Sequence, residues 1–176
     1  MANLATLPAF VDRRTFRAVV ESPRGAAVKL KYDAERQILS LSRPLPVGLV
    51  FPYDFGFVPS TKAADEDPVD VMLVWDVASF PGIVIECRAV GVVRVKQNRD
   101  DHDRRKRIRN DRILAVPVKA ERDWTTPLTS AGMRRLREEI SNFLVAVTVL
   151  EGKDAAILGW GGPNEAIALI RKSLTR

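Results

Sequence analysis

The chain has 176 residues, of which 46% are hydrophobic, and a formal net charge of +6. This length supports one domain with an adequate core, and the composition excludes a disordered protein. No apolar run reaches the roughly 20 residues of a membrane span. We expect a single domain over residues 1–176, with residues 1–14 loosely held. The positive charge favours anionic partners, either phosphate compounds or nucleic acid.

The N-terminal residues contain no uninterrupted apolar stretch of the kind that a signal peptide has. The chain has one cysteine, Cys87, which cannot form an internal disulfide. Cys87 has apolar neighbours in the sequence, so we expect a buried core thiol rather than a nucleophile. Together these features predict a cytoplasmic protein.

Alternating apolar and polar residues predict three short strands near the N-terminus, at residues 15–21, 27–33 and 38–41. Short turns join them, so we expect a meander. In the second strand Lys29, Lys31 and Asp33 share the polar face. We take Lys31 and Asp33 as candidates for lining a site, and an ordinary solvent-facing surface is the alternative.

The rest of the chain predicts loops, further strands and then helices. Four prolines interrupt residues 44–59, which we expect to be a loop. Strands follow at residues 69–75, 83–95 (bent at Gly91) and 112–116. Apolar residues at helical spacing predict a packing helix capped by Thr129 or Ser130, and a second helix at residues 164–174. This order indicates an α+β fold: a small closed five-stranded, OB-like β-barrel with two C-terminal helices packed outside.

Residues 99–109 form a charge-dense insertion between two predicted strands. Such a segment is typical of a solvated loop, and an anion-binding arm is the functional alternative. The only histidine, His102, lies in this insertion. No cluster of histidines or cysteines in the sequence supports a zinc site.

The densest acidic stretch is Asp65-Glu66-Asp67-Pro68-Val69-Asp70, directly before an apolar strand. In an extended chain Asp65 and Asp67 point the same way, and Pro68 keeps the backbone extended. Carboxylates so close together repel one another unless cations neutralise them, and hard oxygen ligands suit Mg²⁺ or Mn²⁺. The alternative is a solvated acidic turn.

This acidic motif resembles the signature of the soluble family I inorganic pyrophosphatases. Matching pieces occur in the same order along the chain: Val19–Pro23, Lys31-Tyr32-Asp33, Arg43, Phe51–Phe57, Pro81-Gly82, Val90-Gly91-Val92, Ala115-Val116-Pro117 and Gly159-Trp160. The resemblance runs from about Phe16 to the last helix. It implies Mg²⁺-dependent hydrolysis of inorganic pyrophosphate to two phosphates by metal-activated water, with Mn²⁺ as a possible substitute.

The resemblance also implies roles for individual residues. Asp65 and Asp70 would hold the metal, and Asp67 would be a further ligand and the general base. Phosphate would be bound by Lys31, Arg43 and Arg112. Supporting roles would fall to Glu21 and to Asp33, which stands where the family usually has Glu.

The chain departs from the family pattern in the second half of the site. Phe51 and Phe55 replace two tyrosines, and Tyr53, between them in the sequence, is a candidate substitute. Gln97 and Asn98 stand where the family has an Asp-rich loop that supplies further metal ligands, and Asn110-Asp111-Arg112 replaces Asp-x-Lys. Val147-Thr148 replaces a Tyr-Lys pair. Asp111 lies one residue out of register with the family's Asp. We expect Asp100, Asp101 or Asp103 of the insertion as candidate replacement ligands, and either a slower enzyme or one with another substrate.

Two alternatives to pyrophosphate hydrolysis remain open from the sequence. One is hydrolysis of another phosphoanhydride, since Phe51 and Phe55 would admit an organic group. The other is a non-catalytic barrel that binds nucleic acid through Arg104–Arg109 and Arg112, although the insertion has no aromatic residue on which bases could stack. Bacterial members of the family form hexamers, so we expect a homo-oligomer and no membrane association.

Overall fold

A computed structural model describes residues 3–99, 107–120, 130 and 133–175. Asp100, Asp101, His102 and Asp103 lie outside the described residues. The described elements in chain order are η1 (Leu4–Thr6), β1 (Thr15–Ser22), β2 (Val28–Asp33), β3 (Ile38–Pro44), β4 (Asp54–Phe57), β5 (Asp70–Leu73), β6 (Val84–Asn98), β7 (Arg107–Arg109), β8 (Arg112–Pro117), α1 (Arg134–Val149), β9 (Ala156–Gly161) and α2 (Pro163–Lys172).

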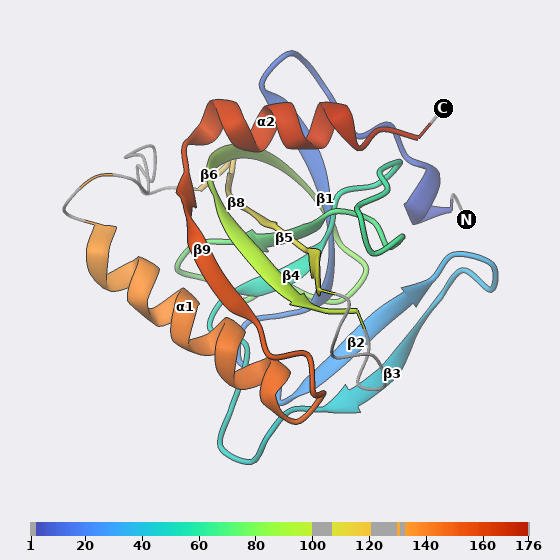
Figure 1. The fold of residues 1–176 in the computed structure, drawn as a ribbon. Coiled ribbons are helices and arrows are strands. Elements are labelled where there is room, and N and C mark those ends of the chain that lie inside the picture. The colour runs from blue at the N-terminus through green and yellow to red at the C-terminus, as the bar shows by residue number, and fades with distance from the viewer. Residues whose placement is uncertain (1–2, 100–106, 121–129, 131–132, 176) are drawn as a thin grey trace.

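Five strands close into a ring, as the sequence predicted (Figure 1). The order is β1-β4-β5-β8-β6, and β6 pairs again with β1. All of these pairings are antiparallel except that of β5 with β8, which is parallel. The two α-helices pack outside the ring, with α1 along one side and α2 across one end. Closure leaves the ring without an unpaired edge.

Strand β6 is the longest element of the sheet, with 15 residues. Its start pairs with β1 and β8, and its end pairs with β7 and β9. A register shift between Ala89 and Gly91 bends it, at the place where the sequence predicted a bend. Since β7 pairs with β6, the last part of the charged insertion is a strand and not a loop.

The meander prediction was wrong, because β2 and β3 form a separate two-stranded sheet. Both edges of β1 are already occupied by β4 and β6. Strand β4 was missed because it lies in the proline-rich stretch, where the prolines flank it. Gly56 makes its pairing possible, since a Cβ there would lie 1.8 Å from the carbonyl oxygen of Val19. Strand β9 was also not predicted.

The barrel strands are buried on both faces. Residues such as Val71 and Leu73 belong to an apolar cluster that includes Ala166 and Ile170 of α2. Their neighbours Met72 and Val74 belong to a second cluster, which α1 completes with Ile140, Phe143, Leu144 and Val147. The predicted core thiol Cys87 is fully buried, and burial raises its pKa. Each helix therefore covers one apolar cluster.

The helix starts differ slightly from the prediction. Helix α1 begins at Arg134 with Met133 at the N-cap, and the carbonyl of Ser130 accepts a hydrogen bond from the Met133 N–H. Helix α2 begins with Pro163, at the position where a missing N–H costs nothing. Neither helix in the described part of the chain is long and apolar enough to cross a bilayer.

Candidate active site

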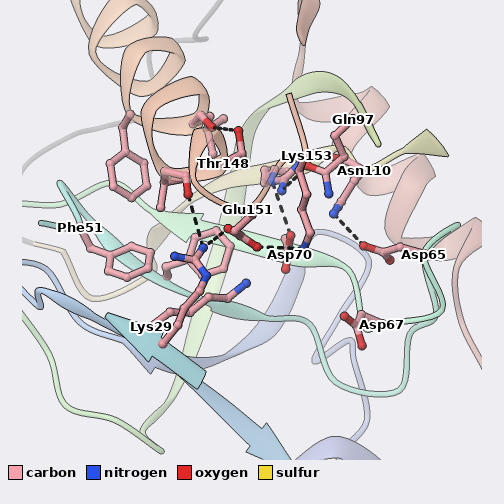
Figure 2. A pocket seen from close by; sticks show the side chains of 16 residues that line it. Lys29, Phe51, Asp65, Asp67, Asp70, Gln97, Asn110, Thr148, Glu151 and Lys153 are labelled. Carbon is pink, nitrogen blue, oxygen red and sulfur yellow. Dashed lines mark hydrogen bonds and ion pairs between the residues drawn. The ribbon is translucent and has the colours of Figure 1, made fainter. Parts of the chain in front are cut away.

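A pocket lies where the acidic segment, residues 65–70, meets the β2–β3 hairpin, the β6 and β8 strands and the end of α1 (Figure 2). Its lining combines four carboxylates, four basic side chains and five apolar ones. The lining residues are Lys29, Arg43, Phe51, Phe55, Asp65, Asp67, Asp70, Gln97, Asn110, Arg112, Phe143, Leu144, Val147, Thr148, Glu151 and Lys153.

Asp65 is held by a neutral partner. Its Oδ2 accepts a hydrogen bond of 2.7 Å from Nδ2 of Asn110, which lies between β7 and β8. Its Oδ1 is buried and has no hydrogen-bond partner among the residues that the structure describes. Burial raises the pKa of this carboxyl group, and the nearby charges of Asp70 and Asp67 raise it further. A buried acceptor without a donor is the kind of group that a bound cation or water satisfies.

Asp67 and Asp70 each face a basic side chain. Lys31 Nζ donates to both carboxylate oxygens of Asp67, at 2.9 and 3.0 Å. Burial lowers the pKa of Lys31, but its hydrogen bond to Asp67 and the charge of that carboxylate outweigh this effect, so the net shift is upward. Nε of the buried Arg112 lies 3.4 Å from Oδ2 of Asp70.

The donor set fits a hard divalent cation in its chemistry, because three aspartates line one pocket and Asp65 has an unpartnered buried oxygen. Among the residues that the structure describes, however, no three Asp, Glu, His or Cys side chains converge closely enough to hold a metal ion. Asp67 lies 2.9 Å from Nζ of Lys31, and Asp70 lies 3.4 Å from Nε of Arg112. Two of the three candidate ligands are therefore already paired with cations.

Lys29 and Arg43 lie opposite each other on β2 and β3, and both line the pocket. From the sequence we predicted a site role for Lys31, on the polar face of β2. We predicted none for Lys29, which lies two residues away on the same face. Lys31 lies in an adjoining hollow that shares Lys29, Asp67 and Asp70 with the pocket. The strand period alone cannot distinguish two lysines on one face.

Glu151 and Lys153, from the turn between α1 and β9, were also missed. The Glu151 carboxylate pairs with the Arg43 guanidinium and, at 3.1 Å, with Lys153 Nζ. All three side chains are partly buried. Arg43 also donates to the carbonyl of Val147, at 3.5 Å. No motif in the sequence signals this contact, because it joins residues more than 100 positions apart.

Gln97, Asn110 and Arg112 stand where the chain departs from the family pattern, and in the structure they contact one another. Arg112, with 6% of its surface exposed, donates to the side chain of Gln97 at 3.2 Å and to the carbonyl of Asn110. Asp111 faces elsewhere: it accepts hydrogen bonds from the Val95 N–H and from Arg109. It lines a different hollow, so the structure does not bring it into the pocket.

One side of the pocket is apolar, made by Phe51, Phe55, Phe143, Leu144 and Val147. Phe51 contacts both Phe55 and Phe143, with ring centroids 5.5 and 5.3 Å apart. Tyr53 packs against the same cluster but does not line the pocket, and burial raises its pKa. We call the five apolar side chains the apolar side.

The two supporting residues lie in different places. Glu21 is 7% exposed, lines the adjoining hollow and accepts a hydrogen bond of 2.7 Å from the Tyr32 N–H. Burial raises its pKa to about 7 despite that hydrogen bond. Asp33 instead closes the β2–β3 turn, where it accepts from the N–H groups of Glu35 and Arg36. The structure does not bring Asp33 into the pocket.

The arginines of the proposed nucleic-acid surface are used within the fold where they are described. Arg112 is buried, Arg109 pairs with Asp111 at 2.6 Å, and Arg107 donates to the carbonyls of Lys96 and Asp154. Residues 104–106 lie outside the described part of the chain.

Comparison with known proteins decides the family. A family model described as inorganic pyrophosphatase matches residues 18–176. The chain belongs to the inorganic pyrophosphatase family. It is 33% identical over 173 residues to the inorganic pyrophosphatase of a Nostoc strain, covering 98% of this chain and 97% of that one. Over 171 residues it is 31% identical to the enzyme of a Synechocystis strain, covering 97% and 96%.

Solved structures agree with this assignment. The crystal structure of inorganic pyrophosphatase from Thermus thermophilus superposes with a TM-score of 0.85 and 28% identity, covering 98% of this chain and 97% of that one. An enzyme of this family from Coxiella burnetii gives a TM-score of 0.82 at 28% identity, covering 95% and 97%. The chain is thus a hydrolase of the pyrophosphatase family with the OB-like architecture that the sequence predicted.

Proposed function

We propose that this protein hydrolyses inorganic pyrophosphate to two phosphate ions in the presence of Mg²⁺, for which Mn²⁺ can substitute. The observation that carries the proposal is the pocket itself. In a pyrophosphatase fold, three aspartates and the basic side chains of β2, β3 and β8 line a single cavity. Carboxylates in such a cavity can position the attacking water, and cations can neutralise the charge of the substrate.

Asp65 and Asp70 would hold the cation, with Asp67 beside them. A bound divalent cation lowers the pKa of water and neutralises charge on phosphate oxygens. The Asp67 carboxylate acts as the general base and receives the proton of the attacking water. The water oxygen forms a bond to one phosphorus, the bond from that phosphorus to the bridging oxygen breaks, and the leaving phosphate keeps the electron pair.

The other side chains bind the substrate or orient the catalytic groups. Lys29 and Arg43, which line the pocket, would contact the phosphate oxygens, and Arg112 supplies positive charge next to Asp70. Lys31 fixes the orientation of Asp67 through its two hydrogen bonds. Glu21 anchors β2, the strand that carries Lys29 and Lys31, through the Tyr32 N–H.

The test is release of phosphate from pyrophosphate, measured with Mg²⁺, with Mn²⁺ and with EDTA. We expect turnover with either metal ion and none with EDTA. Absence of phosphate release at every divalent cation concentration would refute the proposal.

The apolar side favours a second candidate substrate, a phosphoanhydride that carries an organic group. Five apolar side chains would contact such a group while the charged side binds the phosphates. Comparing kcat/KM for pyrophosphate with that for a nucleoside diphosphate distinguishes the two substrates.

We also propose a homo-oligomer, with a hexamer as the expected state. The supporting observation is the outer surface of α1 and its end, where Val149 and Leu150 are 56% and 77% exposed. Sedimentation velocity measures the assembly, and a monomer at micromolar concentration would contradict this part of the proposal.

A further inference from the structure

A second hollow, of about 520 Å³, lies between the chain that leads into β1, the strands β6 and β8, and the helix α2. Four arginines line it, and among the residues that the structure describes no carboxylate does. Arg13 and Arg14 come from the chain before β1, Arg88 from β6 and Arg171 from α2. We call this cavity the arginine hollow. Its described lining has no residue in common with that of the candidate active site.

Contacts with described residues hold only one of these four guanidinium groups in place. Arg171 donates to the carbonyl of Arg13 at 3.0 Å, and its guanidinium lies 5.7 Å from the centre of the Phe10 ring. Arg13, Arg14 and Arg88 are exposed, and their side chains donate no hydrogen bond to a residue that the structure describes. Three arginines of the hollow are therefore available to an incoming anion.

One carboxylate lies near the arginine hollow without lining it. Asp12 Oδ1 accepts hydrogen bonds of 2.8 Å from the N–H groups of Arg14 and Thr15. These bonds lower the pKa of Asp12, and the charge of Arg88 lowers it further. The four arginines together with this one aspartate leave a formal charge of +3. Such a concentration of positive charge in a concave surface attracts anions.

The floor of the arginine hollow is apolar. Val90 of β6 and Val116 of β8 are 5% and 6% exposed, and Ile167 of α2 lines the hollow with them. Asn164, Ile167 and Arg171 follow one another at helical spacing along α2, so they share the face of the helix that borders the hollow. A ligand there meets apolar side chains on one side and guanidinium groups on the other.

We propose that the arginine hollow is a second binding site, which takes a small organic molecule with two or more phosphate groups. Guanidinium groups bind phosphate oxygens through pairs of parallel hydrogen bonds. An organic diphosphate carries about three negative charges at neutral pH, which balances the charge of the hollow. The organic group contacts the apolar floor. Cavities of about 300–1,000 Å³ suit ligands of this size.

The experiment is photolabelling of the full chain with 8-azidoadenosine diphosphate in EDTA, followed by digestion and mass spectrometry. The azido group is on the base, so we expect the label near Val90, Val116 or Ile167. Arg14→Gln and Arg88→Gln each remove one partner of the phosphates. In each variant the concentration that gives half-maximal labelling should rise about tenfold.

The matched controls are Arg36→Gln and Arg135→Gln, at exposed positions outside the arginine hollow. Both should be labelled like the wild type. Unlabelled adenosine diphosphate in excess should abolish the label. Adenosine and tripolyphosphate, which lack the phosphates and the organic group respectively, should each need at least about a tenfold higher concentration to do so. Circular dichroism checks that each variant is folded.

Three results would overturn this inference. One is a label confined to residues that line the candidate active site. Another is equal half-maximal labelling in the wild type, Arg14→Gln and Arg88→Gln. The third is removal of the label by adenosine or tripolyphosphate as effectively as by adenosine diphosphate. The inference does not depend on the proposed function: labelling of the hollow in a protein that never cleaves pyrophosphate would uphold the former and refute the latter.

Discussion

The acidic segment and the apolar side line the same pocket but are held in place by different interactions. The aspartates at residues 65, 67 and 70 each meet a specific polar partner, at 2.7 to 3.4 Å. The apolar side is continuous with the core beneath α1 and makes ring contacts instead. Small changes in the acidic segment should therefore alter the chemistry, whereas changes on the apolar side should alter which substrate fits.

The largest expected effect is that of Asp67→Asn on turnover. The two side chains are nearly the same size, but an amide cannot accept the proton of the attacking water. We expect kcat to fall by about 10²–10⁴-fold while phosphate binding is retained. The control is Glu138→Gln, the same change of carboxylate to amide on the exposed surface of α1. Wild-type kcat in Asp67→Asn would remove Asp67 from the mechanism.

Arg112→Met should lower the stability of the fold. Both members of its pair with Asp70 are largely buried, so the substitution leaves a carboxylate without its cation. We expect a loss of about 3–5 kcal/mol in the free energy of unfolding, and a smaller loss for Arg112→Lys. Urea denaturation measures the difference. Arg135→Met, at an exposed position on α1, is the control and should change little.

The raised pKa of Glu21 predicts that the free energy of unfolding depends on pH. Its pKa in the folded state is about 7, above the ordinary value of 4.5, so the folded protein binds its proton more tightly. The contribution of this bound proton to the free energy of unfolding is fully present below about pH 4.5 and is lost as the pH rises through 7. The loss amounts to about 3 kcal/mol. Urea denaturation in EDTA at pH 5 and pH 8 should show this slope in the wild type. An unchanged slope in Glu21→Gln would contradict the assignment.

The smallest expected effect belongs to the apolar side. Phe55→Tyr adds a hydroxyl group to a ring that lines the pocket next to Lys29. A new hydrogen bond to phosphate is worth about 1 kcal/mol, so KM for pyrophosphate should fall about fivefold with little change in kcat. Phe80→Tyr, at an exposed position, is the control. A fall in KM for an organic phosphoanhydride but not for pyrophosphate would favour the second candidate substrate.

Much of this arrangement was readable from the sequence. The acidic segment, the closed ring and the two outer helices follow from local composition and periodicity. The choice of strand partners did not follow from the sequence, because pairing is decided between distant segments. For this reason β2 and β3 were wrongly joined to β1, and β4 and β9 were missed.

The choice between Lys29 and Lys31 shows the same limit at the level of one side chain. Both lie on the polar face of β2. Lys29 lines the pocket, whereas Lys31 lines only the adjoining hollow. Glu151 lies in a short turn with no motif, and its partner Arg43 comes from the other half of the chain. Such contacts depend on how the elements pack, which periodicity does not describe.

The long strand β6 also has a consequence for how the molecule forms. Thr15 pairs with Arg88 near one end of this strand, and Ala156 pairs with Lys96 near the other. Pairings between residues so far apart in the chain make folding slow, in the range of about milliseconds to seconds, because long loops must close first. The pocket draws on residues from Lys29 to Lys153. During synthesis a nascent chain therefore has no complete site until nearly all of its residues have emerged.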